Sequence, residues 1–130
     1  KLTLADIERA EAQRVTLMNR AIAFFQTYDL LLCPTTIVAP FPVEQRYLAE
    51  CDGVKFDNYV GWLAIVSAIT IACCPGLSIP CGFTRENLPV GLQIMAPSMA
   101  DDRLYNVGAA LETALTDRWG HLLIEEAPAL

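Results

Sequence analysis

Apolar residues recur at helical spacing along the first quarter of the chain, from about Thr3 to Thr27. They are Leu4, Ile7, Ala10, Leu17, Ala21 and Phe24. This spacing predicts one long amphipathic helix over residues 3–27. Thr3 can cap its first turn, and Asp6 adds a negative charge near the positive end of the helix dipole. Arg14 falls within the apolar stripe, so its guanidinium either extends past the stripe to water or pairs with a carboxylate from outside this chain.

The middle of the chain alternates between short apolar runs and turn residues. The run 28–33 precedes Pro34 and predicts a strand buried on both faces, after which prolines at 34, 40 and 42 hold an irregular loop. A stretch without charge, 58–84, predicts a buried helix over 57–72 and then a strand over 77–83. A second apolar run, 88–95, follows after three polar residues, which predicts an antiparallel hairpin.

The last periodic stretch predicts a helix that Asp101 or Asp102 caps and that ends near Gly120. Its apolar face carries Leu104, Val107, Leu111, Ala114 and Leu115. The resulting order is helix, strand, helix, strand, strand, helix. Strands this apolar need cover on both faces, so the pattern predicts a layered α/β architecture with a mixed sheet.

The uncharged stretch of 27 residues also suggests a membrane span. However, Pro75 and Pro80, together with Gly76 and Gly82, interrupt it. Residues 59–74 alone are shorter than the roughly 20 residues that a bilayer core requires, and no basic flank orients them. A buried helix followed by a strand is the preferred interpretation, and a single-span membrane protein is the alternative.

Composition suggests that these 130 residues need help to bury their apolar surface. The chain is 54% apolar and 18% charged, whereas typical domains are about 45–50% apolar and a quarter charged. A compact fold of this size hides roughly two-thirds of its unfolded surface. We therefore expect the chain to be part of a larger body. A net charge of −6 without basic clusters argues against a nucleic-acid partner.

The five cysteines are an odd number, and none of them forms a C-x-x-C pair. This favours free thiols in a reducing compartment over disulfides or a zinc site. No signal-peptide pattern is visible, so we expect a cytoplasmic protein. Nothing in the sequence supports a metal or an organic cofactor.

A search for a nucleophile finds no catalytic set. The serines are Ser67, Ser78 and Ser98, and none lies in a G-x-S-x-G turn or a Gly-Ser-rich loop. Cys81 and the lone His121 are forty residues apart without a third group. The carboxylate pairs 101–102 and 125–126 are explained by capping and by a solvated tail. Spacing alone therefore identifies no active site.

Two polar or small residues stand out in the predicted hairpin. Gln93 lies within a buried run, so its amide should find partners, more plausibly as a structural hydrogen bond than as a substrate contact. Gly91, within a strand, suggests a bulge or a close approach of the backbone.

The segments Pro75-Gly-Leu-Ser-Ile-Pro-Cys-Gly-Phe83 and Leu88-Pro-Val-Gly-Leu-Gln-Ile-Met-Ala-Pro97 resemble the C-terminal part of the amidase signature family. The stretch 28–35 is similar to that family's Asp-to-Pro-Thr strand, and 101–104 is similar to the start of its late helix. The order and separations agree from about residue 14 to residue 112. Two positions depart from the pattern, since Thr70 and Cys73 stand where the family commonly has Asn and Gly.

The resemblance implies that residues 1–130 are the C-terminal segment of a single amidase-type domain, an α/β/α layered fold with a mixed sheet. The family hydrolyses carbon–nitrogen amide bonds through a serine acyl-enzyme, with a second serine and a lysine base. None of these residues lies in this chain, which we therefore expect to be inert alone. The implied partners are a small-molecule amide and the remainder of the domain. Because such a separated segment exposes a large apolar face, we also expect either self-association into a homo-oligomer or a missing partner segment. The alternative is a non-enzymatic binding module that retains the fold segment without the chemistry.

The resemblance also suggests substrate-binding residues. In the family the helix before the 77–83 strand helps to wall the acyl pocket, and Val60, Leu63 and Ser67 share one stripe of that helix here. They would give a mainly apolar pocket for a small aliphatic or aryl amide, and a packing role is the alternative for each. Unchanged relative rates on small and bulky amides after Leu63→Trp would count against the pocket.

Overall fold

A computed structural model describes residues 1–119 of the protein. In chain order, the elements are α1 Leu4–Phe24, β1 Leu31–Pro34, β2 Glu50–Cys51, β3 Val54–Lys55, the 3₁₀ turn η1 Gly61–Leu63, α2 Ala64–Ile71, β4 Gly76–Phe83, β5 Pro89–Met95 and α3 Asp101–Trp119. The predicted helix end at Gly120, His121 and the 125–126 carboxylates lie outside the described residues.

The central sheet has three strands in the order β1-β5-β4, and both neighbouring pairs are antiparallel. The predicted hairpin is confirmed, with Leu77 opposite Ile94 and Ser78 opposite Gln93. The register shifts between Pro80 and Gly82, across from Gly91. A separate two-stranded ribbon, β2-β3, follows the proline-containing loop and was not predicted.

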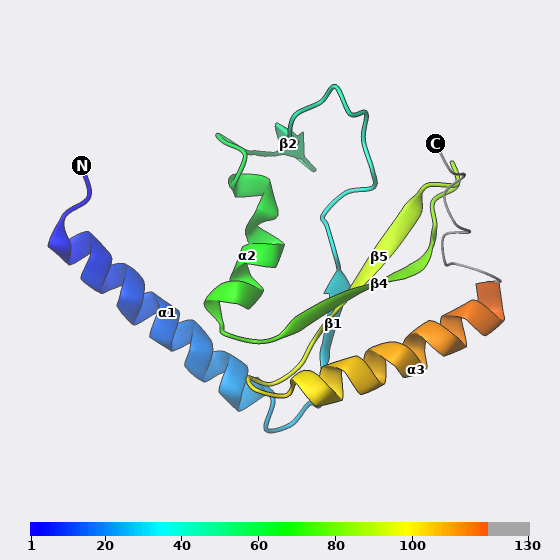
Figure 1. Cartoon of the computed structure of the whole chain (residues 1–130). Coiled ribbons are helices and arrows are strands. Elements are labelled where there is room, and N and C mark those ends of the chain that lie inside the picture. The colour runs from blue at the N-terminus through cyan, green and yellow to red at the C-terminus, as the bar shows by residue number, and fades with distance from the viewer. Residues whose placement is uncertain (120–130) are drawn as a thin grey trace, which may run out of the picture.

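One face of the sheet is covered by α3, which runs along β4 and β5 (Figure 1). The core on this face consists of Ile79, Ile94, Ala96 and Leu104. Leu111 and Leu115 of α3 also pack there, as the predicted apolar face requires, whereas Ala114 is exposed. The helix begins at Asp101, so both aspartates lie within its first turn. The prediction that one of them is the cap is therefore wrong, and their charges act on the helix dipole instead.

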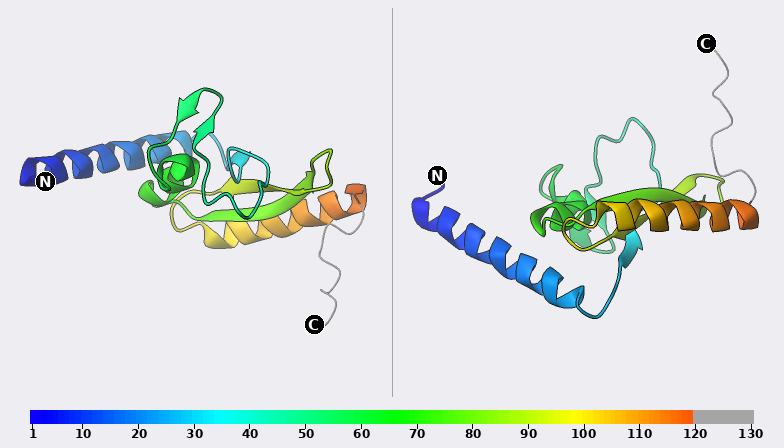
Figure 2. Two further views of the ribbon diagram at one scale, coloured as in Figure 1. Left: turned by 90° about the horizontal axis from the view of Figure 1, so that it is seen from above. Right: turned by 60° about the horizontal axis from the view of Figure 1, so that its bottom comes forward.

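The opposite face of the sheet is partly open. Leu31 on this face is 37% exposed, and Leu32, which shares the α3 face with its neighbour Ile94, is 49% exposed. The predicted burial of this strand on both faces is therefore wrong for the described residues. The strand also begins later than predicted, because Tyr28 is held against the end of α1: its amide donates to the Phe24 carbonyl and its ring stacks on Phe24. Figure 2 shows α1 extending well beyond the sheet.

The long first helix forms as predicted, with a capping box at its start. The Thr3 hydroxyl accepts a hydrogen bond from the Asp6 amide, and the Asp6 carboxylate accepts one from the Thr3 amide. The Thr3 hydroxyl also donates to the Asp6 carboxylate at 2.6 Å. This hydrogen bond, followed by the one from the Thr3 amide, lowers the pKa of Asp6. Yet α1 contains no buried residue, and its apolar stripe is largely exposed.

The second helix is shorter than predicted. It begins at Ala64 after a 3₁₀ turn, rather than at residue 57. The cause is Asn58, whose side-chain oxygen accepts hydrogen bonds from the amides of Val60 at 2.9 Å and Gly61 at 3.1 Å. This local side-chain turn competes with helical hydrogen bonding and delays the helix. None of the helices among residues 1–119 is both long enough and apolar enough to cross a membrane.

Candidate functional site

A pair of hydroxyl groups lies on the open face of the sheet, where β1 ends. Thr35 Oγ1 and Ser78 Oγ are 2.7 Å apart, and the Thr35 amide donates to the Gly91 carbonyl at 3.1 Å. A Cβ atom at position 91 would stand only 2.6 Å from Thr35 Oγ1 and 3.1 Å from Ser78 Oγ. Of the two predicted explanations for Gly91, the sheet shows the bulge, in the facing strand between Pro80 and Gly82. The space of the missing side chain is occupied by the hydroxyl pair rather than by a backbone segment.

A cleft of about 500 Å³ opens beside this pair. It is bounded by the loop 34–41, by Trp62 and by residues 89–91 of β5. Two prolines, Pro34 and Pro40, restrict the backbone of the loop, and Thr36 Oγ1 donates to the Val38 carbonyl at 2.7 Å. The volume lies in the range of small-molecule sites.

Aromatic rings form one wall of the cleft. Phe41 meets Trp62 edge-on with ring centroids 5.8 Å apart, and Trp62 meets Tyr59 in the same way at 6.3 Å. Tyr47 in turn contacts Tyr59. The Trp62 Nε1 atom is buried and has no hydrogen-bond partner among the described residues.

Gln93 lies in the sheet next to the hydroxyl pair and is 8% exposed. Its Oε1 accepts a hydrogen bond from Cys33 Sγ of the adjacent strand, at 3.6 Å. Burial raises the pKa of the Cys33 thiol, which keeps it protonated and able to donate. The predicted hydrogen bond of Gln93 between segments is therefore confirmed.

The three residues predicted to line an acyl pocket do not lie together in the cleft. Val60 is 65% exposed, whereas Leu63 and Ser67 are half-buried. None of the three borders this cleft, the cavity beside Met18 and Cys73, or the groove between α1, α2 and β1. Their role in a complete enzyme stays a prediction. Trp62, from the same stretch, borders the cleft instead.

The cleft can bind a molecule, but its own side chains cannot activate a nucleophile. No histidine, lysine or carboxylate is among its lining residues in the described part of the chain. Ser78 has Thr35 as its polar side-chain partner, and a hydroxyl is not a base for it. Nor do residues 1–119 contain a group of three His, Cys, Asp or Glu that could hold a metal ion.

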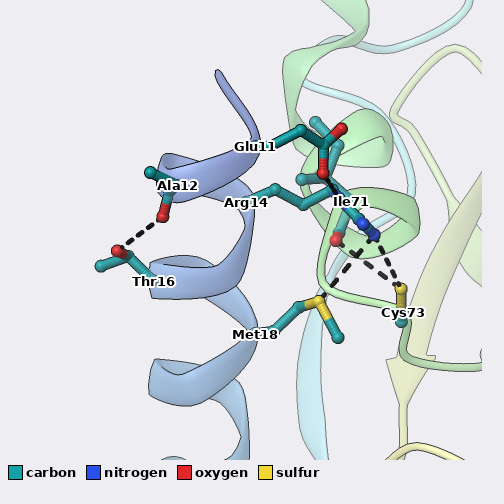
Figure 3. A network of polar contacts seen from close by, with 7 residues as sticks. All are labelled: Glu11, Ala12, Arg14, Thr16, Met18, Ile71 and Cys73. Atoms are coloured by element: carbon teal, nitrogen blue, oxygen red, sulfur yellow. Dashed lines mark hydrogen bonds and ion pairs between the residues drawn. The ribbon is translucent and has the colours of Figure 1, made fainter. Parts of the chain in front are cut away.

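A second polar cluster links α1 to the turn before β4 (Figure 3). Arg14 Nε donates to Glu11 at 2.9 Å, while its Nη1 faces the sulfur atoms of Met18 and Cys73, each at 3.9 Å. The Glu11 carboxylate raises the pKa of Arg14. Arg14 is thus exposed and pairs with Glu11 of its own helix. This agrees better with the predicted guanidinium that reaches water than with a predicted partner carboxylate from outside the chain.

One of the two departures from the family pattern lies in the turn at Cys73. Cys73 has a φ of 57°, in the left-handed region that glycine adopts without strain. A glycine is what the resembled family commonly has there. The chain keeps this turn despite the substitution, and β4 follows in its predicted place.

Comparison with known proteins gives consistent matches. The model of a family described as Amidase matches residues 3–105. The chain is 43% identical over 130 residues to a glutamyl-tRNA(Gln) amidotransferase subunit of Streptomyces avermitilis, covering 96% of the chain and 24% of that protein. Its identity to the protein of the same name from Streptomyces coelicolor is 45% over 109 residues, covering 82% of the chain and 20% of that protein.

Solved structures agree on the fold. A bacterial aryl acylamidase belonging to the amidase signature enzymes matches with a TM-score of 0.78 at 24% identity, over 88% of the chain and 24% of that structure. A glutamyl-tRNA(Gln) amidotransferase subunit from Thermotoga maritima matches with a TM-score of 0.67 at 25% identity, over 84% of the chain and 22% of that structure. These neighbours confirm the predicted α/β fold class. The chain spans about a quarter of the length of the relatives it matches.

Proposed function

Because this chain belongs to the amidase family, we propose that residues 1–130 are the C-terminal segment of a single amidase-type domain that cleaves carbon–nitrogen amide bonds. The family match and the four motifs in their expected order support the activity. The chain's own role in substrate binding is inferred from the cleft beside Thr35 and Gly91, a binding surface that lacks any base.

In this proposal the chemistry is divided between two parts of the domain. A serine from the remainder of the domain attacks the amide carbonyl, and a lysine there takes the proton of the serine. The carbon–nitrogen bond breaks, the amine leaves with a proton, and the acyl group stays on the serine. Water or a second amine then accepts the acyl group. The present chain holds part of the amide substrate and covers the sheet.

Transfer of the released nitrogen to an acceptor, with water then taking the acyl group from the serine, is a second candidate for the fate of the amide. It is favoured by the curated relatives, which are 41–45% identical in the first four cases and are named as components of an amidotransferase. That name would also give this protein further polypeptides as partners. Hydrolysis and amide transfer differ in the fate of the nitrogen, so its recovery as the free amine or in an acceptor separates them.

The proposal further places the protein in the cytoplasm. The support is that the cysteines at 33, 51, 73, 74 and 81 are all free thiols. Such thiols persist in a reducing compartment.

The test is a hybrid protein in which this chain replaces the matching segment of the Streptomyces avermitilis relative. Amine release from a panel of uncharged amides and L-glutamine is measured for the hybrid, for the chain alone and for the truncated relative. We expect activity in the hybrid only. A folded hybrid without activity would favour the non-enzymatic binding module, and an active isolated chain would contradict the division of the chemistry.

A further inference from the structure

We infer that the group of the amide substrate held in this cleft is uncharged and apolar, of the aryl or branched-alkyl class. This inference rests on the proposed function and specifies its substrate. It is drawn from the lining of the cleft, the shape of its aromatic wall and the hydrogen-bonding capacity left at the Thr35–Ser78 hydroxyl pair.

The charge of the lining is the first argument. The cleft is bordered by twelve residues, and none of these is charged at neutral pH. They are Pro34, Thr35, Thr36, Ile37, Val38, Ala39, Pro40, Phe41, Trp62, Pro89, Val90 and Gly91. A charged group that enters such a site loses its water without gaining a counter-charge, which is strongly unfavourable. The cleft therefore selects against amides whose side group carries an ammonium or a carboxylate.

The aromatic wall is the second argument. Trp62 and Phe41 both border the cleft and meet edge-on, so ring faces and edges are available at one side of a 500 Å³ space. Aromatic groups pack favourably in edge-to-face and offset arrangements. Aliphatic side chains of the loop, Ile37 and Val38, supply the other side.

The hydroxyl pair supplies the polar end of the cleft. Thr35 and Ser78 have two hydroxyl protons between them, and their mutual hydrogen bond uses one. The second proton is free to be donated. Thr36 is different, since its hydroxyl already donates to Val38. A free hydroxyl donor beside an apolar cleft matches a molecule with an acceptor, such as an amide carbonyl, and an apolar remainder.

Two matched substitutions in the same loop test the inference in the hybrid protein. Val38 borders the cleft, whereas Val43 is 92% exposed and is not among the residues that line the cleft. Val38→Asp should lower kcat/KM for benzamide about tenfold or more, and Val43→Asp should leave it within about twofold. Val38→Thr, which keeps the shape, should cause a smaller loss. The unmodified hybrid should prefer benzamide to L-glutamine by about tenfold or more.

A preference for L-glutamine, or equal effects of the two aspartate substitutions, would overturn the inference while leaving the proposed function in place. If the hybrid cleaves neither benzamide nor L-glutamine, the proposed function fails. The inference about the cleft is then tested by ligand binding alone. In the chain with Trp119→Phe, emission from Trp62 reports on the cleft. Benzamide should change this emission with a Kd that Val38→Asp weakens and Val43→Asp does not, and L-glutamine should have no effect. The absence of a benzamide response from a chain that is folded by circular dichroism would overturn the inference.

Discussion

Thr35 and Ser78, which belong to two other segments, leave no room for a side chain at Gly91. We expect Gly91→Ala to destabilise the protein by about 1–3 kcal/mol, because the new methyl group must displace the hydroxyl pair. Urea unfolding of the chain at high dilution measures the loss. Gly76→Ala is the matched control in the partner strand, since a methyl group there meets its neighbours at an ordinary 3.5 Å or more. Equal stability of the two variants would show that the hydroxyl pair is free to move.

The capping box at the start of α1 should respond to pH through Asp6. Its pKa lies below the ordinary 3.8 because the folded carboxylate accepts hydrogen bonds from the Thr3 side chain and then from the Thr3 backbone. A group with a lowered folded pKa stabilises the folded state above its unfolded pKa, and this contribution is lost as the pH falls through the folded value. The first turn of α1 should therefore fray as the pH falls below 3.8.

Amide hydrogen exchange at residues 4–7, compared between Asp6→Asn and the unmodified chain, measures this effect. The difference in protection should be present at about pH 7 and shrink toward about pH 2. Glu8→Gln, a change outside the box in the same helix, should leave protection of these amides unaltered. A difference between Asp6→Asn and the unmodified chain that persists unchanged in acid would refute the role of the carboxylate.

The residues of the site were only partly predictable from the sequence. Gly91 and Gln93 were predicted to have close or polar neighbours, because a glycine and an amide in an apolar strand each need a local reason. Thr35 and Ser78 were not paired in advance, since they are 43 positions apart and belong to no short motif. The prediction for Val60, Leu63 and Ser67 came from a resemblance, and it depends on a pocket that these residues do not form within the described chain.

Among the elements, long periodic stretches were predicted well and their ends less so. The two long helices and the hairpin follow directly from apolar spacing. The start of α2 depends on the side chain of Asn58, and the β2-β3 ribbon has only two residues in each strand, which is too short to show alternation. Such features are decided by single hydrogen bonds rather than by a repeated pattern.

The packing of α3 on the sheet depends on Gly108, which is buried against Leu77 of β4. A Cβ atom at this position would overlap Leu77 Cδ2. We expect Gly108→Val to cost about 1–3 kcal/mol because its branched side chain separates the helix from the strand. Ala109→Val, at the next and exposed position, should cost only about 0.5 kcal/mol through helix propensity. Urea unfolding compares the two, and equal losses would show that α3 does not need this close approach.

At the scale of the whole molecule, the protein exposes a large apolar surface. The buried apolar residues of the described part are only Ile69, Ile79, Ile94, Ala96 and Leu104. On the other side of the sheet, a groove of about 450 Å³ runs between α1, α2 and β1 and is lined almost entirely by apolar side chains. The apolar composition of the sequence indicates this excess of apolar surface. Composition does not indicate which face of the sheet is left uncovered. In our account the remainder of the amidase domain covers it.

Sedimentation velocity of the chain, alone and mixed with the separately produced preceding part of the Streptomyces avermitilis relative, tests the central claim most directly. We predict that the chain alone self-associates through its exposed apolar face, and that the added polypeptide converts it to a one-to-one complex. A stable monomer that unfolds cooperatively and ignores the added polypeptide would contradict the account.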